Sequence, residues 1–209
     1  EAGVVLKVLR TWIVTLFELL KEVHGQVSIV IQTLLPNANP DSEASDLWNV
    51  VVVNIQQMIY DFVDSSTLFE QQPPAVLKTN VKFAVVVSNL AGIHLEPENN
   101  NPNTDQVNTY VVSEAQAKTL KEFRTKTPLG LSNPTVTSCA PMFNNSKPML
   151  YDESTSTFSA QFLNISLGKV KRNTKKSDAA VTEEKLCLVF QTVLKFCGVV
   201  SCIVFFHFL

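Results

Sequence analysis

A cluster of basic side chains is the part of this 209-residue sequence best suited to bind a charged ligand. Five cations fall within eight positions: Lys169, Lys171, Arg172, Lys175 and Lys176. We expect residues 168–184 to form a loop between two strands, and such a loop suits phosphate binding because each neutralised phosphate releases counterions. A solvated loop without a ligand is the alternative, since runs of charge commonly stay in water.

Motifs for enzymatic chemistry are missing from the sequence. It contains no GxxxxGK[ST] phosphate loop, GxSxG nucleophile motif, HExxH zinc motif or GxGxxG dinucleotide motif. Its four cysteines form no CxxC pair, so we expect no metal site and predict reduced, mostly buried thiols. Glu183 and Glu184 would face opposite ways on a strand and make no paired-carboxylate site. We therefore predict no enzymatic activity and no cofactor.

The overall composition is that of a chain that folds around apolar cores. Apolar residues make up 45% of it and charged residues 17%, so we expect no global disorder. The formal net charge of −2 excludes an overall basic surface, and nucleic-acid binding would need a local patch. The sequence starts at Glu1 with neither an initiator methionine nor a signal peptide, and we expect it to be a piece of a longer protein.

Two helices are predicted in the first third of the sequence. Residues 3–35 show the spacing of an amphipathic helix, with apolar residues at Val5, Leu9, Trp12, Leu16, Leu19, Val23, Val27, Val30 and Leu34. A breaker segment, residues 36–46, separates it from a second helical pattern over 47–64. We expect a hairpin or part of a bundle whose apolar stripes face their own core. A groove for a partner is the alternative.

The periodicity changes after Pro73 and Pro74, which we expect to end the helical part. Apolar and polar residues alternate over 77–87, which predicts a long strand with Lys78 on its polar face. Further strands are predicted over 106–113, 146–153, 156–167 and 184–196, and a short helix over 114–123. The pattern indicates two domains that meet at the prolines, the second being a β-sandwich or barrel.

Several segments resemble the signal transducers and activators of transcription, the STAT family. Those similar to its DNA-binding domain are QQPPAVLKTNVKF (71–83), FRTKTPLGL (123–131), YDESTSTFSAQFLNISL (151–167) and AAVTEEKLCLVFQT (179–192). Those similar to the last two helices of its coiled-coil domain are LRTWIVTLFELLKEV (9–23) and LWNVVVVNIQQMIYDFVDSSTLFE (47–70). The matches run in family order over residues 9–196.

The resemblance implies an α+β multidomain fold. Residues 1–68 would be an antiparallel helical pair at the end of the coiled-coil domain. Residues 69–196 would be an immunoglobulin-like, Rel-type β-barrel, incomplete at its C-terminus. Residues 197–209, an atypical apolar tail, depart from the family pattern, and the family's SH2 domain and phosphorylated tyrosine are not found. The tail is shorter than the roughly 20 residues that span a membrane, and we expect a truncated or mispredicted end.

The resemblance also implies that loops, and not a recognition helix, contact DNA. The positions it assigns to DNA binding are Lys78, Arg124, Lys169, Lys171, Arg172, Val181, Thr182 and Glu183. Lys78 would approach the groove and reach guanine O6 and N7 or a phosphate, and Arg124 would contact the backbone. Thr182 would donate to a phosphate or base edge, and Glu183 would accept from cytosine N4 or water. The loop over residues 168–184, the basic segment, would lie near the duplex and is linked to nuclear import.

Together these features predict a fragment of a latent, cytokine-pathway transcription factor of the cytoplasm and nucleus. Its expected partners are double-stranded DNA, a homo- or heterodimer partner in the full-length protein, and proteins that contact the helices, with no membrane. The alternative is a truncated protein-interaction fragment that cannot bind DNA alone, because barrel strands and the SH2 domain are missing.

Overall fold

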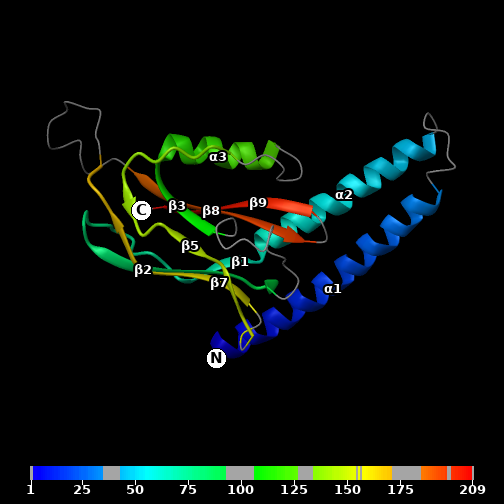
Figure 1. The fold of residues 1–209 in the computed structure, drawn as a ribbon, viewed down its shortest axis with the longest axis horizontal. Helices are drawn as coiled ribbons and strands as arrows, with labels where there is room; N and C mark the ends of the chain where they lie inside the picture. The colour runs from blue at the N-terminus through cyan, green and yellow to red at the C-terminus, as the bar shows by residue number, and fades with distance from the viewer. Residues whose placement is uncertain are drawn as a thin grey trace.

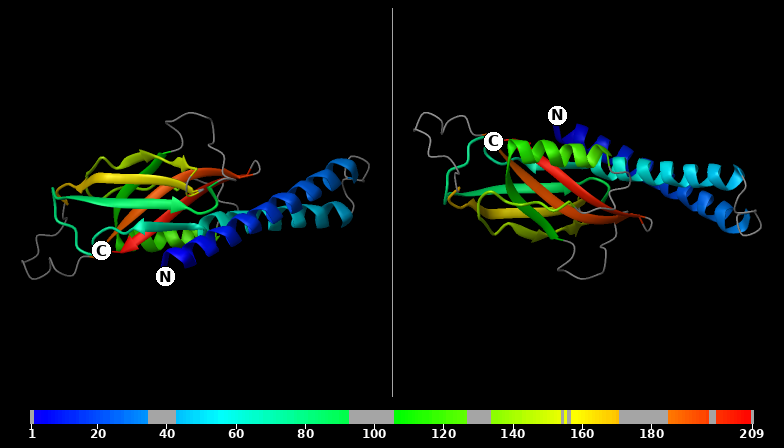
Figure 2. Two further views of the ribbon diagram at one scale, coloured as in Figure 1. Left: turned by 90° about the horizontal axis from the view of Figure 1, so that it is seen from below. Right: turned by 90° about the horizontal axis from the view of Figure 1, so that it is seen from above.

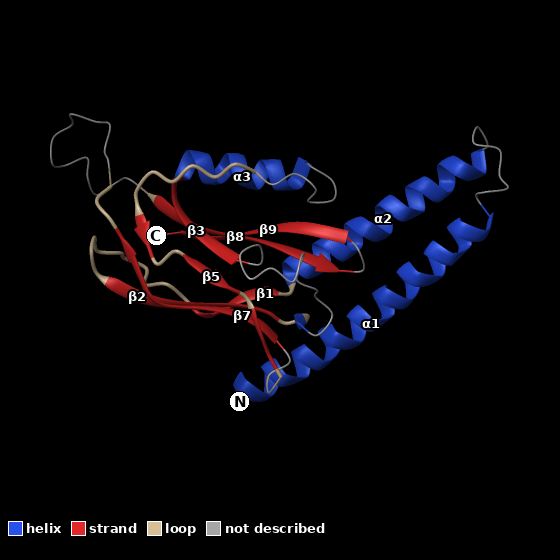
Figure 3. Ribbon diagram, in the orientation of Figure 1, coloured by secondary structure: helices blue, strands red, loops and turns tan. Residues whose placement is uncertain are grey.

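The described parts of the chain form three helices and two antiparallel sheets (Figure 1). The computed structural model describes residues 2–34, 43–92, 106–126, 134–153, 155, 157–170, 185–196 and 199–208. Two long helices project from the sheets, and the third helix lies along the sheets (Figure 3). The described strands form two separate sheets and do not close into a barrel.

The two long helices, α1 (Ala2–Leu34) and α2 (Glu43–Ser65), form an antiparallel hairpin. They confirm the helices predicted over 3–35 and 47–64. The hairpin closes on aromatic side chains: Phe17 of α1 is fully buried, and its ring centroid lies 4.6 Å from that of Phe62 on α2. Ile13 and Ile55 pack against the same core, so one face of each helix is covered.

A second apolar face of α1 lies in solvent. Its members are exposed side chains at alternating spacings of four and three: Val5, Leu9, Trp12, Leu16, Leu19 and Val23. Val5 and Trp12 are each 68% exposed. The prediction that this stripe faces the core of its own chain is therefore wrong for these six residues. The reason is geometric, because α2 covers the face of α1 that carries Ile13 and Phe17.

The first sheet consists of β1 (Thr67–Gln71), β2 (Lys82–Asn89), β7 (Thr157–Leu167) and β4 (Met142–Phe143) in that order, and β6 (Leu150–Asp152) also pairs with β7. The second sheet has the order β5 (Ser146–Pro148), β3 (Gln106–Ser113), β8 (Leu186–Phe196) and β9 (Val199–Phe208). All pairs are antiparallel. Strands predicted over 106–113, 156–167 and 184–196 are confirmed within two residues.

The two sheets pack face to face around one apolar core (Figure 2). The rings of Phe162 on β7 and Phe190 on β8 are both fully buried, and their centroids lie 5.9 Å apart across the two sheets. Side chains alternate along each strand, so Leu188 and Phe190 face this core while Cys187 and Val189 face the other way. The alternation places a second, smaller core on the outer face of β8.

Helix α3 (Glu114–Lys126) covers that outer face and confirms the short helix predicted over 114–123. Its Ala117 and Leu120 are buried against Cys187 and Val189. Burial raises the pKa of the Cys187 thiol to about 11, so this cysteine stays protonated at neutral pH. Cys139 and Cys187 are both free thiols, as the sequence predicts for these two.

Polar contacts fasten the helical hairpin to one end of the sandwich. The Asn89 amide at the end of β2 donates to Val63 O of α2 at 2.9 Å, while its Oδ1 accepts from the Ala91 amide. Arg10 of α1 donates to Glu70 of β1 at 3.0 Å. Since Lys82 and Asn89 are the two ends of β2, the turn before Lys82 lies at the opposite end of the sandwich, about 25 Å away.

Two boundaries differ from those predicted. Helix α2 ends at Ser65, where the Ser66 hydroxyl and amide both donate to Phe62 O, and strand β1 follows before the double proline. The prolines therefore follow the first strand and do not end the helix. The strand predicted over 77–87 begins only at Lys82, so Lys78 lies in the preceding turn and not on a strand face.

The apolar segment after Phe196, to which the sequence assigns no strand, contains β9. It pairs with β8 from Phe196↔Val199 to Cys187↔Phe208. Both faces of β9 are rich in apolar residues, so the segment lacks the alternation that identifies a half-buried strand. Within the described parts of the chain, no helix has the length and apolar character needed to cross a membrane.

Candidate nucleic-acid interface

The candidate interface is built around a turn that carries Lys78. The Val81 amide donates to Lys78 O at 3.3 Å and closes a turn over residues 78–81. Its third residue, Asn80, has φ of 61°, a left-handed conformation that glycine and asparagine adopt more readily than other residues. Pro73 is buried and Leu77 packs against the core, whereas the Lys78 side chain is exposed. The residues before the turn are therefore anchored in the core, while the Lys78 side chain extends into solvent.

One backbone hydrogen bond brings this turn to the beginning of the basic segment. The Asn80 amide donates to Leu167 O at the end of β7, at 2.7 Å. Lys78 lies two residues before Asn80, and Lys169 lies two residues after Leu167. Both lysines are exposed. The structure therefore brings Lys78 and Lys169, separated by 91 positions in the sequence, to one end of the sandwich.

A close backbone approach fixes the start of the basic segment. The Gly168 amide donates to Pro141 O at 2.8 Å. A Cβ at Gly168 would lie 2.7 Å from Pro141 Cγ and 3.0 Å from Pro141 O, distances that real Cβ atoms rarely tolerate. Only glycine fits here without displacement of the neighbouring chain, so Gly168 determines where Lys169 leaves the sandwich.

We expect Gly168→Ala to lower the free energy of unfolding by about 1–3 kcal/mol, because the added methyl overpacks the contact with Pro141. The matched control is Gly25→Ala, since nothing lies within 4 Å of a Cβ at this position in the middle of α1. Alanine is the better helix former, and this control should raise stability by up to about 1 kcal/mol. Urea denaturation of both variants measures the two effects, and equal signs would contradict the packing argument.

Further cations lie near this end of the sandwich. Lys82, the first residue of β2, is exposed and pairs with Ser166 of β7. The hydrogen bond from Lys118 is the main cause that lowers the pKa of Glu114, and Lys185, which precedes β8, adds a smaller Coulombic effect in the same direction. Lys82 was not among the predicted site residues. Its place on the polar side of the alternation, four residues after Lys78, is the signal that indicates it.

Arg124 does not join this group. Helix α3 begins at Glu114, directly after β3, and Arg124 lies ten residues further along it, about 15 Å from the start of the helix. Its backbone is therefore carried away from the end that holds Lys78 and Lys169. Five predicted site residues lie outside the described parts of the chain: Lys171, Arg172, Val181, Thr182 and Glu183. The flanking residues Val170 and Lys185 are described.

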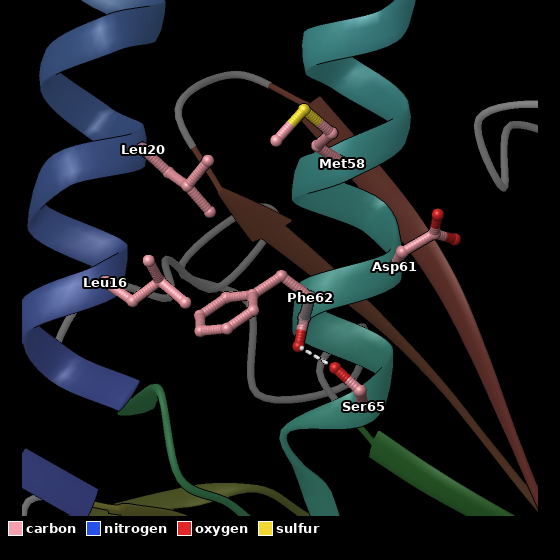
Figure 4. Close-up of a pocket in the computed structure, with 6 residues that line it drawn as sticks. All are labelled: Leu16, Leu20, Met58, Asp61, Phe62 and Ser65. Carbon is pink, nitrogen blue, oxygen red and sulfur yellow. Dashed lines mark hydrogen bonds between the residues drawn. The ribbon is translucent and has the colours of Figure 1, made fainter. Parts of the chain in front are cut away.

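A separate apolar groove lies between α1 and α2 (Figure 4). Its volume is ≈ 290 Å³, and its lining residues are Leu16, Leu20, Met58, Asp61, Phe62 and Ser65. Leu16 and Leu20 of α1 point toward Phe62 and Met58 of α2, whereas the Asp61 carboxylate lies at the far side of α2. Leu16 also belongs to the exposed stripe of α1, so groove and stripe form one continuous apolar surface.

Comparisons with known proteins match the part of the chain that forms the two sheets. The family model described as STAT protein, DNA binding domain, matches residues 71–204. The match runs from the last residue of β1 into β9 and includes the turn of Lys78 and the start of the basic segment. The signal transducer and transcription activator of Drosophila melanogaster is 34% identical over 139 residues, which are 66% of this chain and 18% of that protein. The chain thus spans less than a fifth of this relative's length.

Proposed function

The chain belongs to the STAT family, and we propose that it is a part of a transcription factor that binds double-stranded DNA through loops at one end of its sandwich. Members of this family are transcription factors and not enzymes. The observation that carries the proposal is the hydrogen bond from Asn80 to Leu167 O, which places Lys78 beside the start of the basic segment. Two cationic segments on one rigid edge can contact the same duplex.

The proposed contacts differ in kind. Lys78 enters a groove and reaches guanine O6 and N7 or a phosphate. Lys169, with Lys171 and Arg172, neutralises phosphates and serves in nuclear import. Thr182, next to Val181, donates to a phosphate or base edge, and Glu183 accepts from cytosine N4 or from water. Arg124 contacts the backbone only where the duplex reaches the far end of α3.

The finer architecture follows the same family. We propose that residues 69–196 form the first part of an immunoglobulin-like, Rel-type barrel, and that β9 extends its second sheet. Residues 1–68 are the end of a coiled-coil domain. The heptad-like spacing of the exposed stripe on α1 supports this assignment, since alternating steps of four and three are those of a coiled-coil seam. The partners of this exposed stripe are further helices or other proteins.

In the full-length protein, a homo- or heterodimer would bring two such sandwiches to a palindromic site. A latent, cytokine-responsive factor of this kind moves between cytoplasm and nucleus.

Salt dependence tests the proposal most directly. We expect the affinity of the full chain for a labelled 20-base-pair duplex to fall with salt, with a slope of log K against log salt of about −3 if three to four phosphates are neutralised. Fluorescence anisotropy between 50 and 200 mM salt (roughly the range over which phosphate contacts are lost) measures the slope. A slope near zero, or no binding at the lowest salt, would contradict DNA binding through this surface.

The second candidate function is that of a protein-interaction fragment that cannot bind DNA alone. The exposed apolar stripe of α1 and the adjoining groove favour it. The same anisotropy measurement separates the two functions, because a pure interaction fragment shows no saturable binding to any duplex.

A further inference from the structure

We propose that Asn80 is a positioning residue for DNA binding: its left-handed backbone holds Lys78 against the start of the basic segment. The inference rests on the proposed DNA-binding function and deepens it. It assigns the geometry of the interface to a residue that itself makes no contact with DNA.

The backbone conformation is the first support. Among the described residues other than glycine, only Asn80 (φ 61°) and Asn144 (φ 54°) have positive φ. Asparagine tolerates this region, while a β-branched residue is strongly disfavoured there because its side chain clashes with the backbone. Asn80 is therefore one of the few residue types that allow this turn.

The hydrogen bonds are the second support. The turn is closed by the Val81 amide on Lys78 O and is attached to the sheet by the Asn80 amide on Leu167 O. The first bond depends on the conformation of Asn80, because Asn80 is the third residue of the turn that this bond closes. The second bond attaches the same residue to the end of β7. If Asn80 adopts an extended conformation instead, the Val81 amide no longer reaches Lys78 O and the turn opens.

The anchoring of the flanks is the third support. Leu77 on one side packs against the core, and Lys82 on the other side pairs with Ser166 of β7. Lys78 lies between these two fixed points and is itself exposed. The conformation of Asn80 thus decides whether the Lys78 side chain projects beside Lys169 or elsewhere, while the rest of the sandwich stays in place.

The experiment compares three variants of the full chain. Asn80→Val forbids the left-handed conformation, and Asn80→Gly allows it. Asn144→Val imposes the same backbone conflict on another turn of the sandwich, and it also removes the hydrogen bond that the Asn144 side-chain Nδ2 donates to Asn164 O. Each variant is titrated with the labelled 20-base-pair duplex over a range of salt, and its thermal unfolding is recorded so that binding is measured below its melting temperature.

We expect Asn80→Val to weaken duplex binding about tenfold and to make the salt slope shallower by about one, because one cation leaves the interface. Asn80→Gly should bind like the wild type, and Asn144→Val should bind like the wild type despite its loss of stability. If Asn80→Val binds DNA with unchanged affinity and slope, or no more weakly than Asn144→Val, the positioning role is refuted.

Limited trypsin digestion provides a readout that needs no DNA. Trypsin cleaves after lysine, and we expect cleavage after Lys78 to be faster in Asn80→Val than in the wild type or Asn80→Gly, as judged by fragment masses. Absence of DNA binding by the wild type together with this cleavage pattern would refute the proposed function but keep the role of Asn80 in the turn. Equal cleavage in all variants would refute that role.

Discussion

Reversing the charges of Lys78 and Lys169 together is expected to weaken duplex binding by about 100-fold at low salt. Each side chain loses a charge-assisted contact of about 1.5 kcal/mol, and two such losses correspond to roughly two factors of ten. The glutamates that replace them also repel phosphate. The effect should be the largest on affinity of any double substitution among the described residues, because the structure brings these two cations to one edge.

The control reverses two lysines far from this edge. Lys7 and Lys21 are exposed on α1, in the helical hairpin that joins the opposite end of the sandwich. The variant Lys7→Glu with Lys21→Glu changes the net charge from −2 to −6, as Lys78→Glu with Lys169→Glu does, since each reversal removes one positive charge and adds one negative charge. A general effect of net charge on association would appear in both variants.

Anisotropy titrations of both double variants decide between local contact and overall charge. The site variant should lose affinity about 100-fold and show a shallower salt slope, while the control should stay within about threefold of the wild type. Similar losses in both would show that the chain attracts DNA only through its overall field. Single neutralisations add detail: Lys169→Gln should weaken all duplexes alike, whereas Lys78→Gln should reduce discrimination between duplexes if it reads a base.

The long elements of this fold could be predicted from the sequence because their periodicity extends over many residues. Helix α1 was predicted over 3–35 and spans Ala2–Leu34, and the alternation of β7 and β8 identified both strands. Short or uniformly apolar strands were missed. Strand β1 has five residues between a helix and two prolines, and β9 is apolar on both faces, so neither shows a clear period of two.

The surroundings of a pattern were harder to predict than the pattern itself. Apolar spacing identifies the stripe from Val5 to Val23, but it does not say whether another part of the chain covers it. In this chain α2 covers the adjacent face, with Phe17, and leaves the stripe exposed. Sequence periodicity identifies which residues form an apolar face, while the tertiary structure determines which element packs against that face.

The candidate site shows the same limit. The residue types around Lys78 predicted a cation at the boundary of two patterns, but the alternation continues through Asn80 and carries no information about its φ. The turn, and therefore the direction of Lys78, depends on a hydrogen bond to Leu167, which lies 87 positions later in the chain. Motif similarity connected these segments. The structure brings Lys78 and Lys169 to one end of the sandwich through the hydrogen bond from Asn80 to Leu167 O, and it carries the backbone of Arg124 away from that end.

Phe162→Ala is expected to be the most destabilising of the substitutions considered, with a loss of about 3–5 kcal/mol. The Phe162 side chain is fully buried, and its ring lies edge-on to that of Phe190 across the two sheets, at 5.9 Å between centroids. Truncation removes the contact that joins the sheets at their centre and leaves a cavity lined by Val85 and Phe190, which the rigid strands cannot fill.

Leu163→Ala is the matched control, because Leu163 follows Phe162 on β7 and points to the opposite face, where it is 62% exposed. Its truncation should change stability by no more than about 0.5 kcal/mol. Urea denaturation followed by circular dichroism measures both variants, and tryptophan fluorescence adds a local probe, since Trp12 and Trp48, the two tryptophans, lie on α1 and α2.

If the sandwich depends on this core, Phe162→Ala lowers the urea midpoint of the dichroism transition far more than Leu163→Ala does. Equal midpoints would mean that the two sheets are not held together by the Phe162–Phe190 contact, and that the edge carrying Lys78 and Lys169 has another source of rigidity.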